Sequence, residues 1–216
     1  MAALALTFLA RVAAAQGDDD MANQPTSATS PPPSSANYLQ YGVTFTGEFV
    51  LDSSFAGPMC GESKASDGSP APCILGSGGG VAIRVGVRPS GPWYFGGAYE
   101  LSKQDPNKLY RLAILQQVRA EARYYFVPGY EVQPYASGGL GLGGYGNEWG
   151  VDTWGPAGFL AAGVETQISR RTVVGVALAY RPMYFGRFID TSNTERPPGF
   201  AHLIGLDLLL EARDPL

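Results

Sequence analysis

The sequence has little charge, very little lysine and no long hydrophobic run. Charged residues make up 16% of its 216 residues, against roughly 25% in ordinary soluble domains. Lysine occurs only three times, beside twelve arginines, and the net charge is −4. The composition therefore gives no electrostatic support for binding nucleic acid. No apolar run approaches the roughly 18 to 20 residues that a membrane helix needs.

Cysteine is also scarce. Cys60 and Cys73 are the only two, and both lie in the segment "MCGESKASDGSPAPC". In an exported protein we expect them to form a disulfide that closes a loop, since two free thiols are the less favoured alternative there. Such a ring would stabilise the loop by roughly 3 kcal/mol in the chain-entropy model. The segment offers too few ligands for a metal, and we expect no metal and no cofactor.

Glycine is abundant at 29 residues, and aromatic residues reach 12%, which is typical of a β-rich domain. Residues 1–15 have a short apolar core, and small residues suit cleavage before Gln16, so we expect a signal peptide; a disordered start is the alternative. Residues 16–36 are rich in Pro, Ser, Thr and acid, which predicts a disordered lead. The β domain is expected over residues 37–213.

Apolar residues alternate with mostly polar ones in "YGVTFTGEFVLD", a period of two that predicts a β-strand. The pattern recurs eight times. The expected strands lie within residues 38–52, 80–88, 93–101, 110–126, 132–145, 153–167, 172–185 and 200–212. The fourth is rich in helix formers. However, Arg119, Glu121 and Arg123 alternate with apolar residues there, which favours a strand over a helix.

Charged residues fall on only one face of these strands. The more apolar face carries none, and its polar exceptions are Gln116, Thr166 and His202. The other face carries six arginines and six acids among many small residues. These twelve residues are Glu48, Arg84, Arg88, Glu100, Arg111, Arg119, Glu121, Arg123, Glu165, Arg181, Asp207 and Glu211.

Equal numbers of opposite charges predict that the charged face lines the inside of a closed barrel. The lumen of an eight-stranded barrel is just wide enough for side chains to fill it. Burying unpaired charge there costs several kcal/mol per ion, so the charges must pair. The apolar face then meets lipid, and closing the sheet satisfies the backbone. We expect an all-β fold, an eight-stranded antiparallel up-and-down transmembrane β-barrel. A soluble barrel of lipocalin type is the alternative, with the sheet turned the other way.

The connections agree with a barrel that crosses an outer membrane. Links after the second, fourth and sixth strands are short, whereas those after the first and seventh are long. Bacterial barrels have short periplasmic turns and longer outer loops, so both termini are expected in the periplasm. Trp93, Tyr124 and Phe126 would form one interfacial girdle, and Trp154 and Tyr184 the other.

Three features could carry chemistry. His202, the only histidine, falls on the lipid-facing side near the outer rim, where it is either the base of a lipid-modifying hydrolase or part of a girdle. The run "GGLGLGGYG" resembles a nucleotide loop, but it lies within an alternating strand and no helix follows. The charged lumen is either a structural plug or a path for protons or ions.

From Tyr38 to Arg213, strand number, alternation and loop asymmetry resemble the small eight-stranded OmpA-like and OmpX-like outer-membrane barrels of Gram-negative bacteria. Gly205, Leu208 and Leu210 are similar to the C-terminal signal of that superfamily, which implies recognition by the barrel assembly machinery, although the chain ends "EARDPL" instead of at an aromatic residue. We expect no peptidoglycan-binding domain after the barrel, so anchoring to the cell wall in the manner of OmpA is not implied. Outer-membrane lipid A deacylases carry a serine two positions after their histidine, where this sequence has Ile204.

The resemblance implies a non-enzymatic outer-membrane barrel with an occluded lumen. Its partners would be outer-membrane lipid and an external molecule bound by the loops, in a structural, adhesion or binding role. A narrow diffusion pore is the first alternative, and a lipid-modifying enzyme is the second.

Overall fold

The computed structural model describes residues 37–51, 53–60, 68–69, 71–104, 112–147, 150–190 and 193–216. The predicted signal peptide and the predicted lead, which together cover residues 1–36, lie outside this description, as does Arg111. Within these ranges, no helix has the length and apolar character to cross a membrane.

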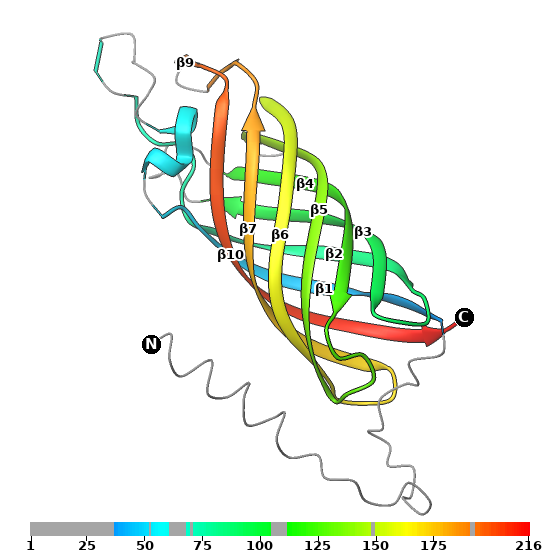
Figure 1. The fold of residues 1–216 in the computed structure, drawn as a ribbon. Helices are drawn as coiled ribbons and strands as arrows, with labels where there is room; N and C mark the ends of the chain where they lie inside the picture. The colour runs from blue at the N-terminus through cyan, green and yellow to red at the C-terminus, as the bar shows by residue number, and fades with distance from the viewer. Residues whose placement is uncertain are drawn as a thin grey trace, which may run out of the picture.

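Eight long antiparallel strands close into a barrel (Figure 1). The first and last of them pair directly, from Tyr38 opposite Pro215 to Phe49 opposite Ile204. The predicted fold class, an eight-stranded up-and-down barrel, is confirmed. The strands are β1 (Tyr38–Phe49), β2 (Gly78–Arg88), β3 (Trp93–Gln104), β4 (Ala113–Tyr125), β5 (Val132–Asn147), β6 (Thr153–Gln167), β7 (Thr172–Phe185) and β10 (Gly199–Pro215).

The alternation of apolar and polar residues predicted the strand positions closely. β6 and β7 have the predicted bounds, and the fourth segment is a strand, as predicted. β10 continues three residues beyond the predicted end at position 212, because Arg213 still points inward and pairs there. The structure therefore adds a charged residue to the lumen that the shorter prediction left out.

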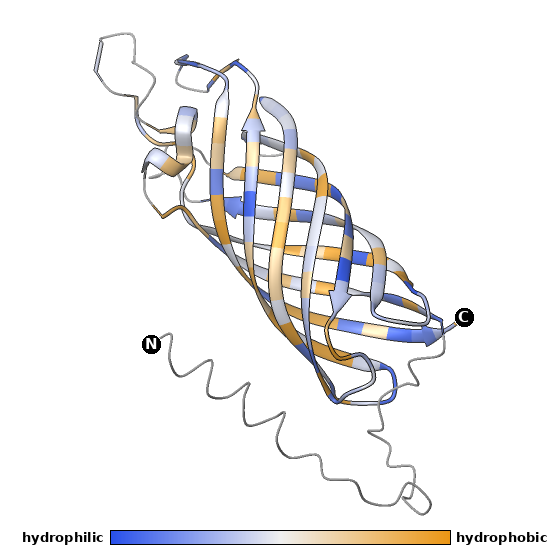
Figure 2. Cartoon of the chain, in the orientation of Figure 1, coloured by the Kyte–Doolittle hydropathy of each residue, from blue (hydrophilic) through white to orange (hydrophobic). Residues whose placement is uncertain are grey.

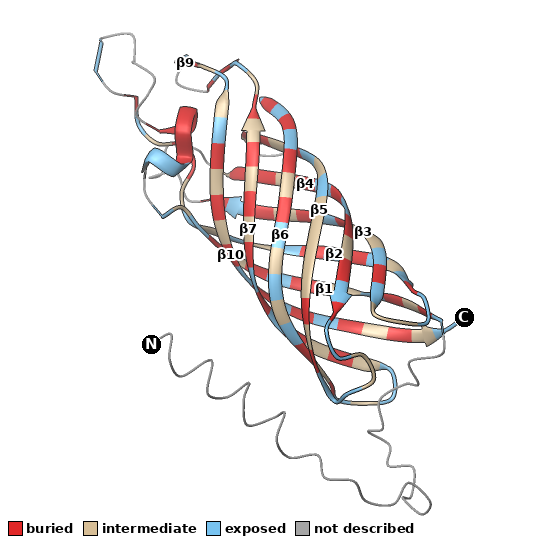
Figure 3. Cartoon of the chain, in the orientation of Figure 1, coloured by how far each residue is buried: buried red, intermediate tan, exposed pale blue. Residues whose placement is uncertain are grey.

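Buried residues alternate with more exposed ones along most of each wall strand (Figure 3). In β2, for example, Ile83 is 59% exposed whereas Arg84 is 5% exposed. The outward positions are predominantly apolar, so hydropathy alternates along the same ribbons (Figure 2). The barrel is therefore polar inside and apolar outside, the reverse of a soluble barrel.

Connections differ between the two ends of the barrel. The β2–β3, β4–β5 and β6–β7 turns are short and lie at the same end as both termini of the barrel, where the amide of Leu216 donates to the carbonyl of Asn37. The β1–β2 loop at the opposite end carries a 3-10 segment, η1 (Ser53–Met59) (Figure 1). The β7–β10 connection there contains a small hairpin, β8 (Phe188–Ile189) with β9 (Glu195–Arg196).

One inward tyrosine shows why strand interiors carry glycine. The buried ring of Tyr94 lies against Gly86 and Gly96. A Cβ at Gly86 would come within 2.6 Å of the Tyr94 ring, and a Cβ at Gly96 would meet the Tyr94 hydroxyl. An aromatic ring packed over strand glycines compensates for their missing side chains. These two glycines therefore make room for a large side chain in a narrow lumen.

The Gly96→Ala substitution should lower the free energy of unfolding by about 1 to 3 kcal/mol, because the added methyl overpacks the site of Tyr94. Urea titration of the protein in detergent micelles measures this change. Gly47→Ala is the matched control in β1, since a Cβ there meets only the Phe49 ring at 3.7 Å. Its effect should stay within about 0.5 kcal/mol; equal losses for both variants would contradict the packing argument.

Candidate functional site

The lumen contains the charged residues singled out in the sequence. Eleven of the twelve are described, and all eleven are buried; Arg111 is the one outside the described ranges. With Arg213, which is 2% exposed, the described lumen holds six arginines and six acids. Its net formal charge is therefore zero. The signal for Arg213 was present, since Asp207, Glu211 and Arg213 all keep the inward phase of one strand.

The middle of the lumen is held by a two-pronged ion pair. Arg123 donates from Nη2 to Glu211 Oε1 at 2.6 Å and from Nη1 to Glu211 Oε2 at 2.9 Å. Gln40 Nε2 also donates to Glu211, at 2.5 Å. Arg123 lies on β4 and Glu211 on β10, so this contact crosses the barrel. Such paired, two-pronged bonds are the strongest that these side chains form.

Nearer the outer end, two arginines share one acid. Arg181 Nη2 donates to Asp207 at 2.7 Å and lies 3.4 Å from Glu100, while Arg119 donates to the same Glu100 at 2.7 Å. Thr46 donates to Asp207 at 2.7 Å. The acids and bases of this layer come from four strands and Thr46 from a fifth, so it joins most of the wall.

Nearer the short turns, Glu165 is the shared acid. Arg213 donates to it, Arg88 lies 3.6 Å from it, and the Tyr125 hydroxyl donates to it at 3.2 Å. Arg88 also donates to Gln133 at 2.8 Å. Each of the three layers therefore contains both signs of charge.

Aromatic rings lie between the arginines. Three guanidinium groups surround the ring of Phe159. Their carbon atoms lie 4.2 Å (Arg119), 5.6 Å (Arg181) and 5.8 Å (Arg84) from the ring centroid. Cation–π attraction of this kind is worth more when the groups are desolvated. Phe159 falls on the charged face of its strand. Its contact with three arginines was not predicted, because an aromatic residue at that position does not by itself indicate which charged side chains lie next to it.

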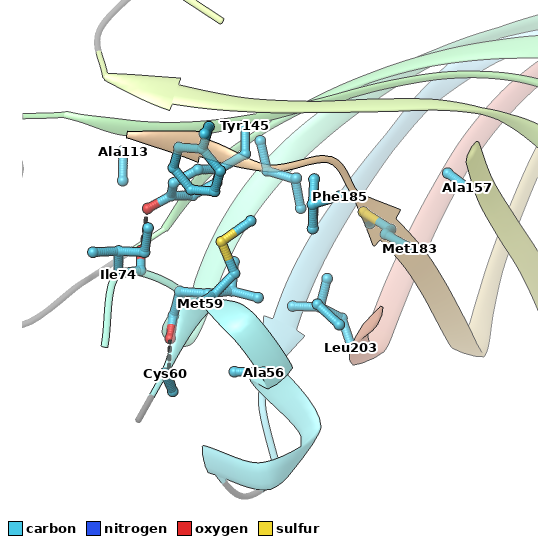
Figure 4. Close-up of a cluster of buried hydrophobic side chains, with 14 residues drawn as sticks. Ala56, Met59, Cys60, Ile74, Ala113, Tyr145, Ala157, Met183, Phe185 and Leu203 are labelled. Atoms are coloured by element: carbon cyan, nitrogen blue, oxygen red, sulfur yellow. Dashed lines mark hydrogen bonds between the residues drawn. The ribbon is translucent and has the colours of Figure 1, made fainter. Parts of the chain in front are cut away.

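An apolar cluster fills the outer end of the barrel, beyond the charges (Figure 4). It joins the β1–β2 loop to inward residues of the wall strands, and Met59 lies among Ile74, Phe185 and Leu203. The alternation predicted the paired charges of the lumen and gave no sign of this apolar cluster. Its buried members are Ala56, Met59, Cys60, Ile74, Leu75, Ala113, Leu115, Tyr145, Ala157, Met183, Phe185, Phe188, Ala201 and Leu203.

Two cross-links hold this outer cap, which we define as the described residues of the β1–β2 loop together with the β8–β9 hairpin. The predicted disulfide between Cys60 and Cys73 is confirmed. Arg196 of β9 is fully buried; it binds Asp190 at 2.8 Å and donates to the carbonyl of Pro72 at 2.8 Å. One buried arginine thus ties the hairpin to the loop that enters the barrel.

Comparison with known proteins gives the fold. No family model matches the chain, and no curated protein matches it. Among solved structures, Neisserial surface protein A is similar to this chain, with 16% sequence identity and a TM-score of 0.50. The match covers 83% of this chain and 97% of the Neisserial chain. The outer membrane protein OprG from Pseudomonas aeruginosa is 12% identical, covering 84% and 98%, with a TM-score of 0.54. The chain has the fold of the small eight-stranded outer-membrane barrels.

In this outer-membrane barrel fold, His202 lies on the outward face, as predicted. Its Nδ1 is 2.8 Å from the Tyr180 hydroxyl, and its ring stacks on those of Tyr180 and Phe200. Phe55 of η1 approaches it edge-on at 6.1 Å between centroids. These contacts are those of an aromatic cluster. Across the described ranges, no three His, Cys, Asp or Glu side chains are grouped to hold a metal ion.

Glu211→Gln should lower the free energy of unfolding by about 3 to 5 kcal/mol, because it removes the two-pronged partner of Arg123 and leaves the buried lumen with one arginine in excess. Asp214→Asn is the matched control: Asp214 pairs with Arg171, which is 72% exposed, and this change should cost less than about 1 kcal/mol. Urea titration in micelles measures both. The double variant Arg123→Met, Glu211→Gln should lose less than the two single losses added together.

Arg196→Ala should loosen the cap and leave the barrel closed, because Arg196 contacts only outer segments. Limited proteolysis of the loop that carries η1 should become at least about tenfold faster, while the heat-dependent gel mobility of the barrel is retained. Arg187→Ala is the control, since Arg187 is 70% exposed and pairs with Glu195 at 3.2 Å. Equal cleavage of both variants would argue against Arg196 as the tie.

Proposed function

We propose that the protein is an integral outer-membrane barrel whose apolar belt faces lipid. The belt is the outward surface of the eight strands, with exposed side chains such as Phe45, Ile83 and Leu178. Two polar side chains within it, Gln116 and His202, have partners in the belt. Tyr99 donates to Gln116 at 3.1 Å, and His202 is bonded to Tyr180. Polar groups in hydrocarbon are costly without a partner, which supports this orientation.

Aromatic clusters near both ends of the belt support the same orientation. At the short-turn end the rings of Trp93 and Tyr124 lie 5.0 Å apart, and those of Tyr124 and Phe126 lie 5.5 Å apart. At the other end Tyr184 and Phe200 lie 5.1 Å apart. Such rings prefer membrane interfaces. The termini and short turns would then face the periplasm, and the cap would face outward.

The barrel acts, in this proposal, as a non-enzymatic and closed protein whose cap meets external partners or reinforces the envelope. The observation that carries it is the apolar cluster at the outer mouth, stacked on a lumen of paired charges. Water or ions would have to displace both layers to pass. The cap itself is fastened by a disulfide and a buried arginine, which suits a rigid recognition surface. Recognition by the barrel assembly machinery stays a prediction.

The purified protein should give no stepwise conductance in planar bilayers, even at a high protein load. Both the apolar cluster at the outer mouth and the paired charges beneath it would block the path of an ion. A channel-forming barrel added to the same membrane is the positive control. Membrane fractionation and gel mobility of boiled against unboiled samples test insertion and closure separately. Regular conductance steps from the wild-type protein would instead favour the pore, the first alternative function.

A further inference from the structure

A groove of about 510 Å³ lies on the outward surface over β3, β4 and β5. The large side chains that line it are Phe95, which is 49% exposed, and Leu140, which is 78% exposed. Leu140 is more exposed than any other large hydrophobic side chain in the described part of the chain. The remaining lining residues are Gly96, Ala120, Glu121, Ala122, Gly138 and Gly139.

The strand register explains the groove. Phe95 is opposite Ala122, which is opposite Gly138, and Ala120 is opposite Leu140. Small outward residues therefore lie side by side on adjacent strands. Between the large side chains of Phe95 and Leu140, only these small residues cover the wall. On β2, by contrast, Val81, Ile83 and Val85 form an unbroken row of exposed branched side chains.

No charge is available to a ligand in this groove. Glu121 is the only charged lining residue, and its side chain is buried on the lumen side, where it lies 3.5 Å from Arg119 and 3.5 Å from Arg123. The other lining residues are glycine, alanine, leucine and phenylalanine. An occupant must therefore be apolar.

The position of the groove indicates which apolar molecule it takes. Phe95 stacks on Trp93 at 5.8 Å between centroids, and Trp93 contacts Tyr124, so the groove adjoins the aromatic cluster at the short-turn end. A lipid with its headgroup at that level can extend one chain along the belt. If the groove stayed empty within the hydrocarbon, the side chains that line it would lose dispersion contacts on their open side. A thin, linear chain can fill this space, whereas the broad wall of a second barrel would meet Phe95 and Leu140 first.

We propose that this groove seats one acyl chain of a phospholipid from the periplasmic leaflet, as a retained lipid distinct from the exchanging lipids around the belt. The proposal rests on the lipid-facing orientation argued under the proposed function. The proposal adds to that orientation a single site for one lipid. The groove is surrounded on all sides by the apolar belt.

The test fills the groove and counts retained lipid. The protein is inserted into vesicles of phosphatidylethanolamine and phosphatidylglycerol, released into mild detergent, and weighed by native mass spectrometry. Gly138→Leu is the main variant, since a Cβ there makes only ordinary contacts, the nearest at 3.4 Å from Leu160. Gly47→Leu is the matched control, an outward strand glycine away from the groove whose Cβ meets only the Phe49 ring. Ala122→Leu fills the same groove if Gly138→Leu does not fold.

The wild-type protein and Gly47→Leu should each retain one phospholipid per chain. Gly138→Leu should retain about tenfold less, because its side chain occupies the space of the acyl chain and removes the dispersion contacts made there. Equal retention by all three, or no retained lipid on the wild type, would overturn the site. A wild-type dimer that Gly138→Leu disperses would assign the groove to a second copy and also overturn it. A protein absent from the outer membrane would instead overturn the lipid-facing orientation, which fractionation detects independently.

Discussion

The paired charges of the lumen are the constraint on which the rest of the structure depends. A sheet that turns its apolar face outward must place something polar in a space only wide enough for side chains. Six arginines and six acids fill it, and each of its layers carries both signs. Because burying these ions is expensive, their geometry has little freedom: each depends on a partner from a different strand. The charges thus do for this barrel what an apolar core does for a soluble domain.

Aromatic rings and glycines complete the same arrangement. Phe159 separates three guanidinium groups, and Arg123 lies between the rings of Tyr94 and Tyr135. Long side chains and large rings can share one lumen only where other inward positions are small. This accounts for the inward strand glycines, such as Gly86 and Gly96 beside Tyr94. The cap then closes the outer end with ordinary apolar packing.

A period of two was enough to predict the barrel, its strands and the face that each charge would occupy. It was enough because the alternation holds along most of each wall strand, and most charges share the inward phase; Lys103 and Asp214, near strand ends, are outward exceptions. The pairing itself could not be predicted, since Arg123 finds Glu211 across the barrel at a sequence separation of 88. The cap was missed for a different reason. Its loop carries Ala56, Met59 and Ile74 without any period, so nothing in the sequence indicated that it packs into the barrel.

The pairing of β1 with β10 also sets when this protein can fold. One edge of β1 stays unpaired until the last residues of the chain are in place, because Tyr38 of β1 lies opposite Pro215 of β10. Glu211 and Arg213, which neutralise arginine and glutamate from earlier strands, arrive at the same moment. A partly delivered chain would hold open edges and unmatched charges together, and distant contacts of this kind are slow to form. The ring of strands and the charge balance of its lumen are therefore completed together, by the same last strand.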